Sequence, residues 1–173
     1  MKIVFLDVDG VLDSLQYWQG VEAYGEAPLD PDAVKRLARL VEQAGGRNAV
    51  ALVLTSSWRV GWERDAALCG NEGTLLNESL AEEGLFIFDR TTVESVGGRP
   101  KEIKKWLREY PGKVESFVIL DDANFLWDEE GLTPYWVQTD FQFGGLKDEH
   151  IAPALAILQK QPLRLKLRNL RKE

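Results

Sequence analysis

Cysteine, histidine and long apolar runs are scarce in this chain of 173 residues, and each scarcity narrows the possible functions. The single cysteine, Cys69, excludes a disulfide within the chain and suits a reducing compartment. We interpret it as a buried, unreactive thiol. The single histidine, His150, is interpreted as a residue on the surface of a helix. Metal sites or catalytic triads built on histidine are therefore not expected.

No apolar run approaches the roughly 20 residues that span a bilayer. The chain enters a strand pattern directly, and no signal-peptide pattern precedes that strand. We therefore expect a cytoplasmic protein with no membrane partner. No internal repeat or low-complexity segment is present.

The formal net charge of -7 is unevenly distributed. The body of the chain is acidic and disfavours non-specific binding to nucleic acid, whereas a short basic tail could still give a local contact. The basic residues of this tail are Arg164, Lys166, Arg168, Arg171 and Lys172. We predict one domain over residues 1–161, followed by a solvated basic tail over residues 162–173.

Apolar segments of strand length alternate with segments of helical periodicity. Strands are expected over residues 3–6, 49–54, 85–88, 117–120 and 135–138, and helices over 31–44, 101–109 and 147–160, with a helical region after Arg59 that is broken near residues 70–73. Residues 13–30 lack periodicity and are interpreted as a loop or flap. Strands separated by helices predict an α/β fold: a single doubly wound, Rossmann-like domain with a five-stranded parallel sheet.

Polar side chains follow three of the expected strands at the point where each strand ends. They are Asp7 and Asp9 after the first strand, Thr55 and Ser56 after the second, and Asp121 and Asp122 after the fourth. A basic residue, Arg99 or Lys101, opens the helix before the fourth strand. Because the carboxyl ends of parallel strands lie at one edge of a sheet, we expect all these groups to meet in one pocket.

This combination of side chains favours phosphoryl transfer. Asp7 and Asp121 can hold a divalent cation that prefers oxygen ligands, most naturally Mg²⁺. The cation would offset the repulsion between Asp7 and a phosphate, so that Asp7 could attack phosphorus and form an aspartyl-phosphate. A hydroxyl of Thr55 or Ser56 could bind a phosphate oxygen, and the basic residue would balance the growing charge. Asp9, with a raised pKa, could protonate the leaving group and then deprotonate water.

The order of these motifs resembles that of the haloacid-dehalogenase (HAD) superfamily of phosphohydrolases. The motifs are Asp-x-Asp-Gly-Val over residues 7–11, a Thr/Ser after a strand, a basic residue, and Asp-Asp after a later strand. Residues 54–59 and 98–107 are also similar to HAD-type domains of Swiss-army-knife RNA repair proteins. The resemblance covers nearly the whole chain and implies an Mg²⁺-dependent phosphatase.

The resemblance also implies individual roles. Asp7 would be the nucleophile and a metal ligand. Asp9 would be the general acid and base, and its backbone carbonyl would bind Mg²⁺. Asp121 would be the third protein ligand, with Asp122 in support.

Two positions stay open. Thr55 or Ser56 can supply the hydroxyl, and we favour Thr55 because it comes first after the strand. Lys101 or Arg99 can supply the positive charge. Here we favour Lys101, since members of the superfamily most often use lysine.

The segments in which this superfamily inserts cap domains are short, so we expect no cap or a minimal one and an open pocket. An open pocket favours a large substrate, such as a nucleic-acid end or a phosphoprotein, or a small one held by the flap. Among these we favour a nucleotide or a nucleic-acid end phosphate. A small sugar or metabolite phosphate is the alternative, as is a non-catalytic phosphate- or partner-binding module that retains the motifs. Both a monomer and a homodimer are compatible with the sequence.

Several large side chains near the expected pocket have two possible roles. Arg59 could pair with an acid or bind a second phosphate. Tyr17, Trp18, Trp58 and Trp62 could stack on a base, although packing is the commoner role of such aromatics.

Overall fold

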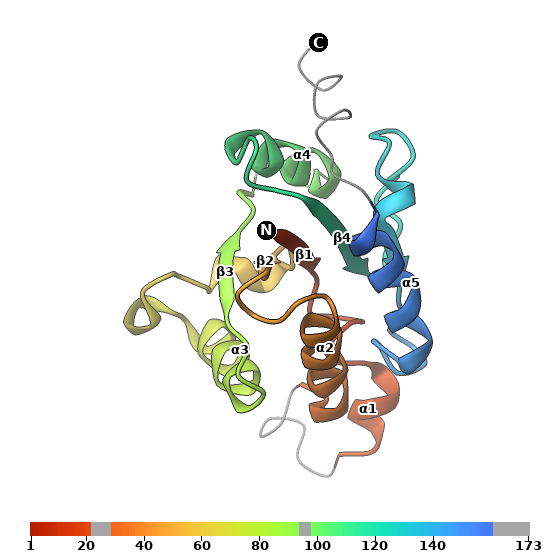
Figure 1. Cartoon of the computed structure of the whole chain (residues 1–173). Coiled ribbons are helices and arrows are strands. Elements are labelled where there is room, and N and C mark those ends of the chain that lie inside the picture. Colours follow the sequence, from red (N-terminus) through yellow and green to blue (C-terminus); the bar gives the residue numbers. More distant parts are fainter. Residues whose placement is uncertain (22–28, 94–97, 161–173) are drawn as a thin grey trace.

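A parallel sheet of five strands forms the centre of this protein in the computed structural model (Figure 1). The structure describes residues 1–21, 29–93 and 98–160. The strands are β1 (Lys2–Leu6), β2 (Val50–Leu54), β3 (Ile87–Arg90), β4 (Ser116–Asp121) and β5 (Trp136–Gln138), and they lie in the order β3-β2-β1-β4-β5. Every neighbouring pair is parallel, which confirms the predicted α/β fold.

The register of the three central strands places their carboxyl ends level with one another. Leu6 at the end of β1 pairs with Leu54 of β2 on one side and with Leu120 of β4 on the other. The residues that follow these positions therefore emerge side by side at one edge of the sheet. This edge is called the carboxyl edge below.

Helices cover both faces of the sheet, as the doubly wound prediction requires. The α-helices are α1 (Leu15–Gln19), α2 (Pro31–Gln43), α3 (Asn71–Glu82), α4 (Arg99–Glu109) and α5 (Asp148–Gln159), and the short 3₁₀ helices are η1 (Ser57–Val60), η2 (Ala66–Leu68) and η3 (Thr133–Tyr135). Val4 and Leu6 of β1 face a core shared with α2, α3 and α5, whereas Ile3 and Phe5 face a core shared with α4. Both sets are fully buried, which explains why β1 is apolar at every one of these positions.

The segment interpreted as a loop or flap contains a short helix, α1. The Ser14 side chain caps this helix by accepting a hydrogen bond from the Tyr17 backbone N–H at 3.1 Å. The helix was missed because five residues are too few for a recognisable period. In the part of the chain that is described, α1 is the one helix between β1 and α2, which agrees with a domain that lacks a large cap there.

The third strand, β3, begins and ends two residues later than predicted. Its last two residues, Asp89 and Arg90, are polar, and contacts with distant segments hold them in the strand. Asp89 accepts hydrogen bonds from Trp106 Nε1 at 2.9 Å and from the Tyr110 hydroxyl at 2.7 Å. Arg90 forms an ion pair with Glu63 at 2.7 Å. These partners come from distant segments, so the local sequence gave no sign that the two polar residues belong to a strand.

The predicted break near residues 70–73 is the beginning of a helix. Gly70 is the N-cap of α3, and Gly73 lies in its first turn. A Cβ atom at Gly73 would lie 2.4 Å from the Gly61 carbonyl oxygen, so glycine allows α3 to pack directly against the chain that follows η1.

The remaining predictions about the chain concern its ends and its surroundings. The basic tail over residues 162–173 lies outside the described residues, so the division at residue 161 stays a prediction. None of the helices in the described segments is both long enough and apolar enough to cross a membrane.

Candidate active site at the carboxyl edge of the sheet

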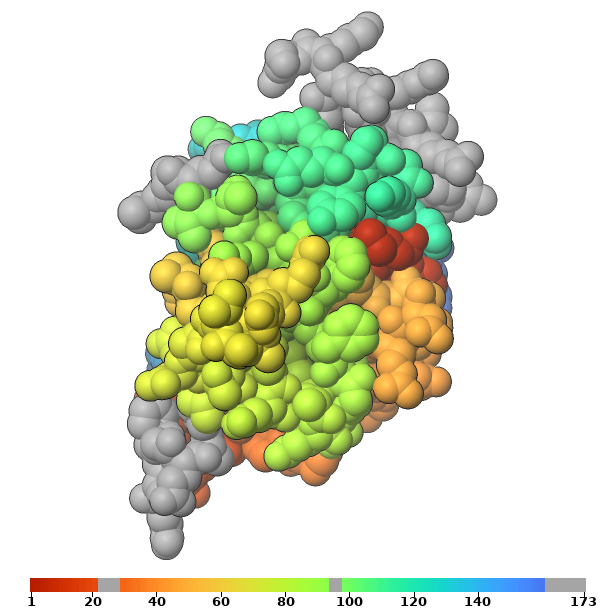
Figure 2. Space-filling view, turned by 90° about the vertical axis from the view of Figure 1, so that its left-hand side faces the viewer, coloured from red at the N-terminus to blue at the C-terminus, as the bar shows by residue number. Residues whose placement is uncertain are grey.

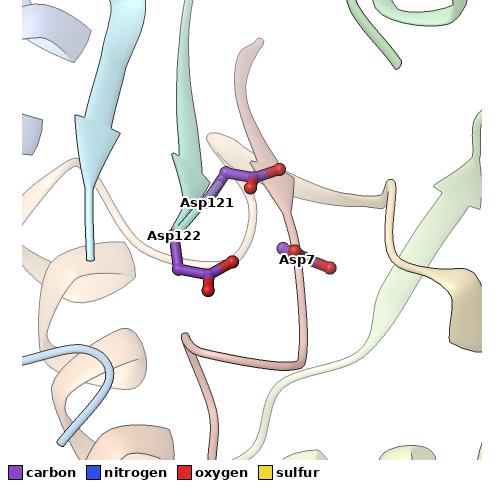
Figure 3. Close-up of side chains that lie close together, drawn as sticks. All are labelled: Asp7, Asp121 and Asp122. Atoms are coloured by element: carbon purple, nitrogen blue, oxygen red, sulfur yellow. The ribbon is translucent and has the colours of Figure 1, made fainter. Parts of the chain in front are cut away.

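Three carboxylates from two neighbouring strands meet at the carboxyl edge (Figure 3). Asp7 directly follows β1, Asp121 is the last residue of β4, and Asp122 comes next. One oxygen atom from each lies within 4.8 Å of the others. The structure therefore brings together side chains that are more than a hundred residues apart in the sequence, as the strand-end pattern predicted.

The surroundings of this cluster suit a hard cation. All three groups offer oxygen atoms, which Mg²⁺ prefers. Gly10 makes room for the cluster, because a Cβ atom at this position would lie 2.5 Å from Asp122 Cγ. Burial, followed by the charge of Asp7, raises the pKa of Asp121 to about 7 and also raises the pKa of Asp122. Both carboxyl groups therefore hold a proton more tightly than an exposed aspartate does, mainly because they are buried.

Arg99 supplies the positive charge beside these acids. Its Nη1 atom lies 2.6 Å from Asp7 Oδ2 and also contacts Asp121 Oδ2. The guanidinium is held over the Phe125 ring, 4.4 Å from the ring centroid. Arg99 thus bridges the acids of β1 and β4.

We favoured Lys101 as the basic residue beside the acids, but in the structure Arg99 contacts them. Lys101 is exposed on α4, whereas Arg99 is the first residue of that helix and reaches the acids. Two positions along a helix correspond to a rotation of about 200°, so the two side chains cannot face the same pocket. The helix also begins two residues earlier than predicted, because Pro100 fits its first turn.

Asp9 lies at the same edge with a partner of its own. Its Oδ1 atom accepts a hydrogen bond from Trp58 Nε1 at 3.2 Å. Burial is the largest cause that raises the pKa of Asp9, and the charge of Asp7 raises it further. A raised pKa is what a carboxyl group requires if it is to donate a proton near neutral pH.

Asp13 is a member of this site that the sequence analysis missed. Its Oδ1 atom accepts a hydrogen bond from the Gly10 backbone N–H at 2.8 Å, while its Oδ2 atom is buried without a partner. Burial raises its pKa to about 7. One signal in the sequence could have pointed to it: Asp13 directly follows the apolar pair Val11-Leu12. An acid next to two buried residues can itself be buried, unlike an acid in an exposed turn.

The structure distinguishes the two hydroxyl groups after β2. Ser56 Oγ accepts a hydrogen bond from the Trp58 backbone N–H at 3.3 Å and caps η1. Thr55 Oγ1 is buried and has no partner, although the Thr55 backbone N–H continues the sheet by donating to the Leu6 carbonyl at 2.9 Å. Thr55 Oγ1 is therefore the hydroxyl without a partner, but Ser56 Oγ only accepts and can still donate its own hydrogen, so the preference for Thr55 stays a prediction.

Arg59 is paired inside the protein, which matches the first of its two predicted roles. Its Nη2 atom lies 2.9 Å from Glu102 Oε2, and both side chains are buried. Its Nη1 atom donates to the carbonyls of Ser56, at 2.9 Å, and of Thr55. Arg59 therefore holds the Thr55–Ser56 turn against α4. A direct contact between Arg59 and a second phosphate stays a prediction.

The aromatic side chains near the site are engaged in packing. Trp62 is buried and donates to Asn77 Oδ1 at 3.0 Å, and Trp18 packs edge-to-face on Phe141. Trp58 is buried, and its Nε1–H donates to Asp9. Stacking of a base on Tyr17, Trp18, Trp58 or Trp62 remains untested.

His150 and Cys69 are each engaged in local hydrogen bonds. His150 lies in the first turn of α5 and is partly exposed, and its Nδ1 atom accepts a hydrogen bond from the Lys147 backbone N–H at 2.9 Å. Cys69 is partly buried, and its thiol lies 3.2 Å from the Glu63 carbonyl oxygen.

Comparison with known families agrees with this geometry. Residues 3–151 match the family model described as the HAD domain in Swiss Army Knife RNA repair proteins. The chain belongs to this family. No curated protein and no solved structure matched it. The family supports a phosphatase-type hydrolase in broad terms, and HAD proteins generally use Mg²⁺.

Proposed function

We propose that this protein is an Mg²⁺-dependent phosphomonoester hydrolase that acts through an aspartyl-phosphate at Asp7. The observation that carries the proposal is the meeting of Asp7, Asp121 and Asp122 within 4.8 Å, beside Arg99 and the unpartnered hydroxyl of Thr55. These groups are a nucleophile, a set of cation ligands, a positive charge and a hydrogen-bond donor. Together they are the requirements of phosphoryl transfer.

Asp7, Asp121 and Asp122 would hold the Mg²⁺, together with the Asp9 backbone carbonyl. When bound, the cation supplies neutralisation of phosphate oxygens and of the three crowded carboxylates. The fit rests on the all-oxygen ligand set and on the meeting of one oxygen atom from each carboxylate within 4.8 Å.

In the first step a carboxylate oxygen of Asp7 forms a bond to phosphorus, and the bond from phosphorus to the leaving oxygen breaks. Asp9 gives its proton to that oxygen, which leaves as an alcohol. Thr55 donates its hydroxyl hydrogen to a phosphate oxygen, and Arg99 stabilises the charge that develops on the others. The product of this step is the acyl phosphate of Asp7.

In the second step Asp9, now a carboxylate, accepts a proton from a water molecule. The water oxygen bonds to phosphorus, and the bond between phosphorus and Asp7 breaks. Inorganic phosphate leaves, and Asp7 and Asp9 return to their initial protonation states. Trp58 keeps Asp9 in place during both steps through its Nε1–H.

We propose a nucleotide or nucleic-acid end phosphate as the substrate. The RNA repair proteins named in the family description favour this class. The absence of a large cap between β1 and α2 in the described residues supports it, because a long substrate needs an open site. The single cysteine, a free thiol in the structure, suits a reducing compartment such as the cytoplasm for this activity.

Release of phosphate from p-nitrophenyl phosphate and from 3′- and 5′-phosphorylated oligonucleotides tests the proposal. Turnover that requires Mg²⁺, stops with a chelator and is lost in Asp7→Asn is expected. A preference for a small sugar phosphate would replace the substrate class and keep the mechanism. A folded protein that binds phosphate esters without turning any of them over would establish a binding module instead.

A further inference from the structure

A buried ion pair lies next to the candidate active site, and its side chains take no part in the two proposed steps. Arg59 lies in η1, Glu102 lies in the first turn of α4, and Arg59 Nη2 is 2.9 Å from Glu102 Oε2. The two side chains are 8% and 0% exposed. Figure 2 shows the side of the molecule where the chain around residue 60 and α4 reach the surface; the pair itself is buried.

The degree of burial of this pair is matched only in the site itself. Among the described residues, the ion pairs in which both side chains are less than 15% exposed are Arg59–Glu102, Arg99–Asp7 and Arg99–Asp121. Every other ion pair between described residues has at least one side chain that is more than 20% exposed. Burying two charges costs solvation free energy, and apolar residues of similar size are often at least as stabilising. Stability alone is therefore a poor explanation for the Arg59–Glu102 pair.

Arg59 holds the turn that follows β2. Its Nη1 atom donates to the carbonyls of Ser56, at 2.9 Å, and of Thr55, while its Nη2 atom donates to Glu102. A planar guanidinium presents its N–H groups in a fixed fork, so these contacts set the direction of the turn as well as its distance from α4. Arg90 holds the same segment, because its Nη1 atom donates to the Arg59 backbone carbonyl.

Glu102 connects this turn to the helix that carries the basic residue of the site. It lies three positions after Arg99 in α4, and residues three apart lie on the same side of a helix. Arg99 Nη1 lies 2.6 Å from Asp7 Oδ2. The Thr55 N–H continues the hydrogen bonds between β2 and β1, so Thr55 lies beside Asp7 at the strand ends. Asp7 thus contacts a basic residue and lies next to a hydroxyl, and the Arg59–Glu102 pair links the elements that carry these two groups.

We propose that the Arg59–Glu102 pair positions two groups for one phosphate, namely the hydroxyl of the Thr55–Ser56 turn and the guanidinium of Arg99, an inference that rests on the proposed function. The pair does not touch the substrate; it fixes the spacing and direction of the β2 turn relative to the first turn of α4. This spacing matters most in the transition state, where charge develops on phosphate oxygens that both groups must face. Arg59 and Glu102 are therefore positioning residues, whose loss is expected to lower kcat more than it raises KM.

Replacement of both partners by apolar residues tests the proposal. Arg59→Met with Glu102→Leu removes both charges of the pair, so that neither is left buried alone. We expect kcat to fall about 10²-fold, the effect of misplacing catalytic groups by about 1 Å, with a much smaller change in KM. Lys104→Met with Glu130→Leu is the matched control, because that pair also joins α4 to another segment, at 2.7 Å. The control should leave both constants unchanged.

Inhibition by vanadate and by inorganic phosphate gives a readout that a loss of folded protein cannot imitate. Vanadate can adopt the trigonal-bipyramidal geometry of the transition state, whereas phosphate is the product. A smaller folded fraction lowers the apparent kcat but changes neither inhibition constant. The ratio of Ki for vanadate to Ki for phosphate is expected to rise about tenfold in the paired replacement and to stay unchanged in the control.

A second variant keeps the test decisive if the paired replacement does not fold. Arg59→Lys keeps a positive charge for Glu102, but one ammonium group cannot bind a carboxylate and two carbonyls in the fixed geometry of a guanidinium. This variant should change both readouts in the same direction, with a lower kcat and a higher ratio of the two inhibition constants.

The outcomes distinguish this inference from the proposed function. Wild-type turnover, with the same kcat and the same inhibition constants in the Arg59 variants, would overturn the inference and keep the enzyme. A loss of kcat with an unchanged ratio of inhibition constants would show a role in folding alone and would also overturn it. A wild type without any turnover would reject the proposed function and this inference with it.

Discussion

Polar groups at the two ends of the sheet differ in whether they have partners. At the amino end, Lys2 Nζ donates to the Ala44 carbonyl at 2.6 Å, Ser116 Oγ donates to the Leu158 carbonyl at 2.6 Å, and the α-amino group of Met1 pairs with Glu115. At the carboxyl edge, three carboxylates crowd together. All four buried side-chain atoms that lack a partner in the described residues also follow β1, β2 or β3 there.

This difference distinguishes polar groups that stabilise the fold from polar groups that are left for a ligand. A buried polar group that is fully bonded stabilises the native state, whereas an unpartnered or repelled group lowers its stability. Proteins usually accept such costs only where a ligand supplies the missing partners. The comparison therefore supports the candidate site at the carboxyl edge independently of the family match.

The largest effect is expected from Asp7→Asn, which removes the nucleophile. We expect kcat to fall at least about 10⁴-fold, as for the loss of a covalent nucleophile in other enzymes. Phosphate release with and without Mg²⁺ measures it. Asp128→Asn removes one exposed carboxylate elsewhere on the chain and should change nothing. Equal activity of the two variants would remove Asp7 from the mechanism.

A smaller effect is expected from Asp9→Asn, which keeps the size of the side chain but cannot donate the proton. For an alkyl phosphate we expect a loss of about 10²–10⁴-fold in kcat, the usual contribution of general acid and base catalysis. For p-nitrophenyl phosphate the loss should be smaller in the first step, since that leaving group needs no proton. Identical losses with both substrates would contradict the proton-donor role.

The pH dependence of stability should show the cost of burying carboxylates close together at the carboxyl edge. Burial and Asp7 raise the pKa of Asp121 to about 7, and burial raises that of Asp13 to about 7, so the folded chain binds these protons more tightly than the unfolded chain. This tighter proton binding contributes to the free energy of unfolding. The contribution is complete below the usual carboxyl pKa of 3.8 and is lost as the pH rises through about 7.

Urea unfolding with a chelator, at intervals between about pH 4 and pH 8, measures this dependence. The free energy of unfolding of the metal-free protein is expected to fall across the interval, and the fall should be smaller in Asp121→Asn. Asp128→Asn should keep the full slope. A stability that rises from pH 4 to pH 7 in the metal-free protein would show that the acids are compensated in some other way.

The smallest effects come from a matched pair of hydroxyl deletions, one at each end of the sheet. Ser116→Ala leaves the Leu158 carbonyl without its donor and should lower the free energy of unfolding by about 1 kcal/mol. Thr55→Val removes a hydroxyl that has no partner, so it should leave stability unchanged or raise it by up to about 1 kcal/mol. Equal losses in the two variants would abolish the contrast between the two edges.

The fold and the acid cluster followed from the sequence because both depend on strong local patterns. An apolar run such as residues 3–6 has few alternatives to a buried strand, and parallel strands must end at one edge. Asp7 and Asp121 were therefore predicted to meet, although no local signal connects them. The β3 boundary was less accurate, since Asp89 and Arg90 join the strand through partners from distant segments.

The details of the site depended on helix phase and on burial, which a single sequence does not reveal. Arg99 and Lys101 lie two positions apart, and the residue at which α4 begins decides which of the two side chains faces the acids. Ser56 and Thr55 differ in whether a neighbouring N–H uses the hydroxyl. Asp13 was overlooked because its burial depends on how the segment after β1, residues 7–13, packs against distant parts of the chain. One such contact is the hydrogen bond from the Thr139 hydroxyl to the Gly10 carbonyl at 2.6 Å.

The most direct test of the central claim is calorimetric titration of Mg²⁺ into the wild-type chain and into Asp121→Asn, with Asp128→Asn as the control. If the acids of β1 and β4 share one cation, the wild type and the control should bind one ion, and Asp121→Asn should lose that binding or weaken it by at least about 10-fold. Unchanged binding in Asp121→Asn, or no binding in the wild type, would contradict the claim.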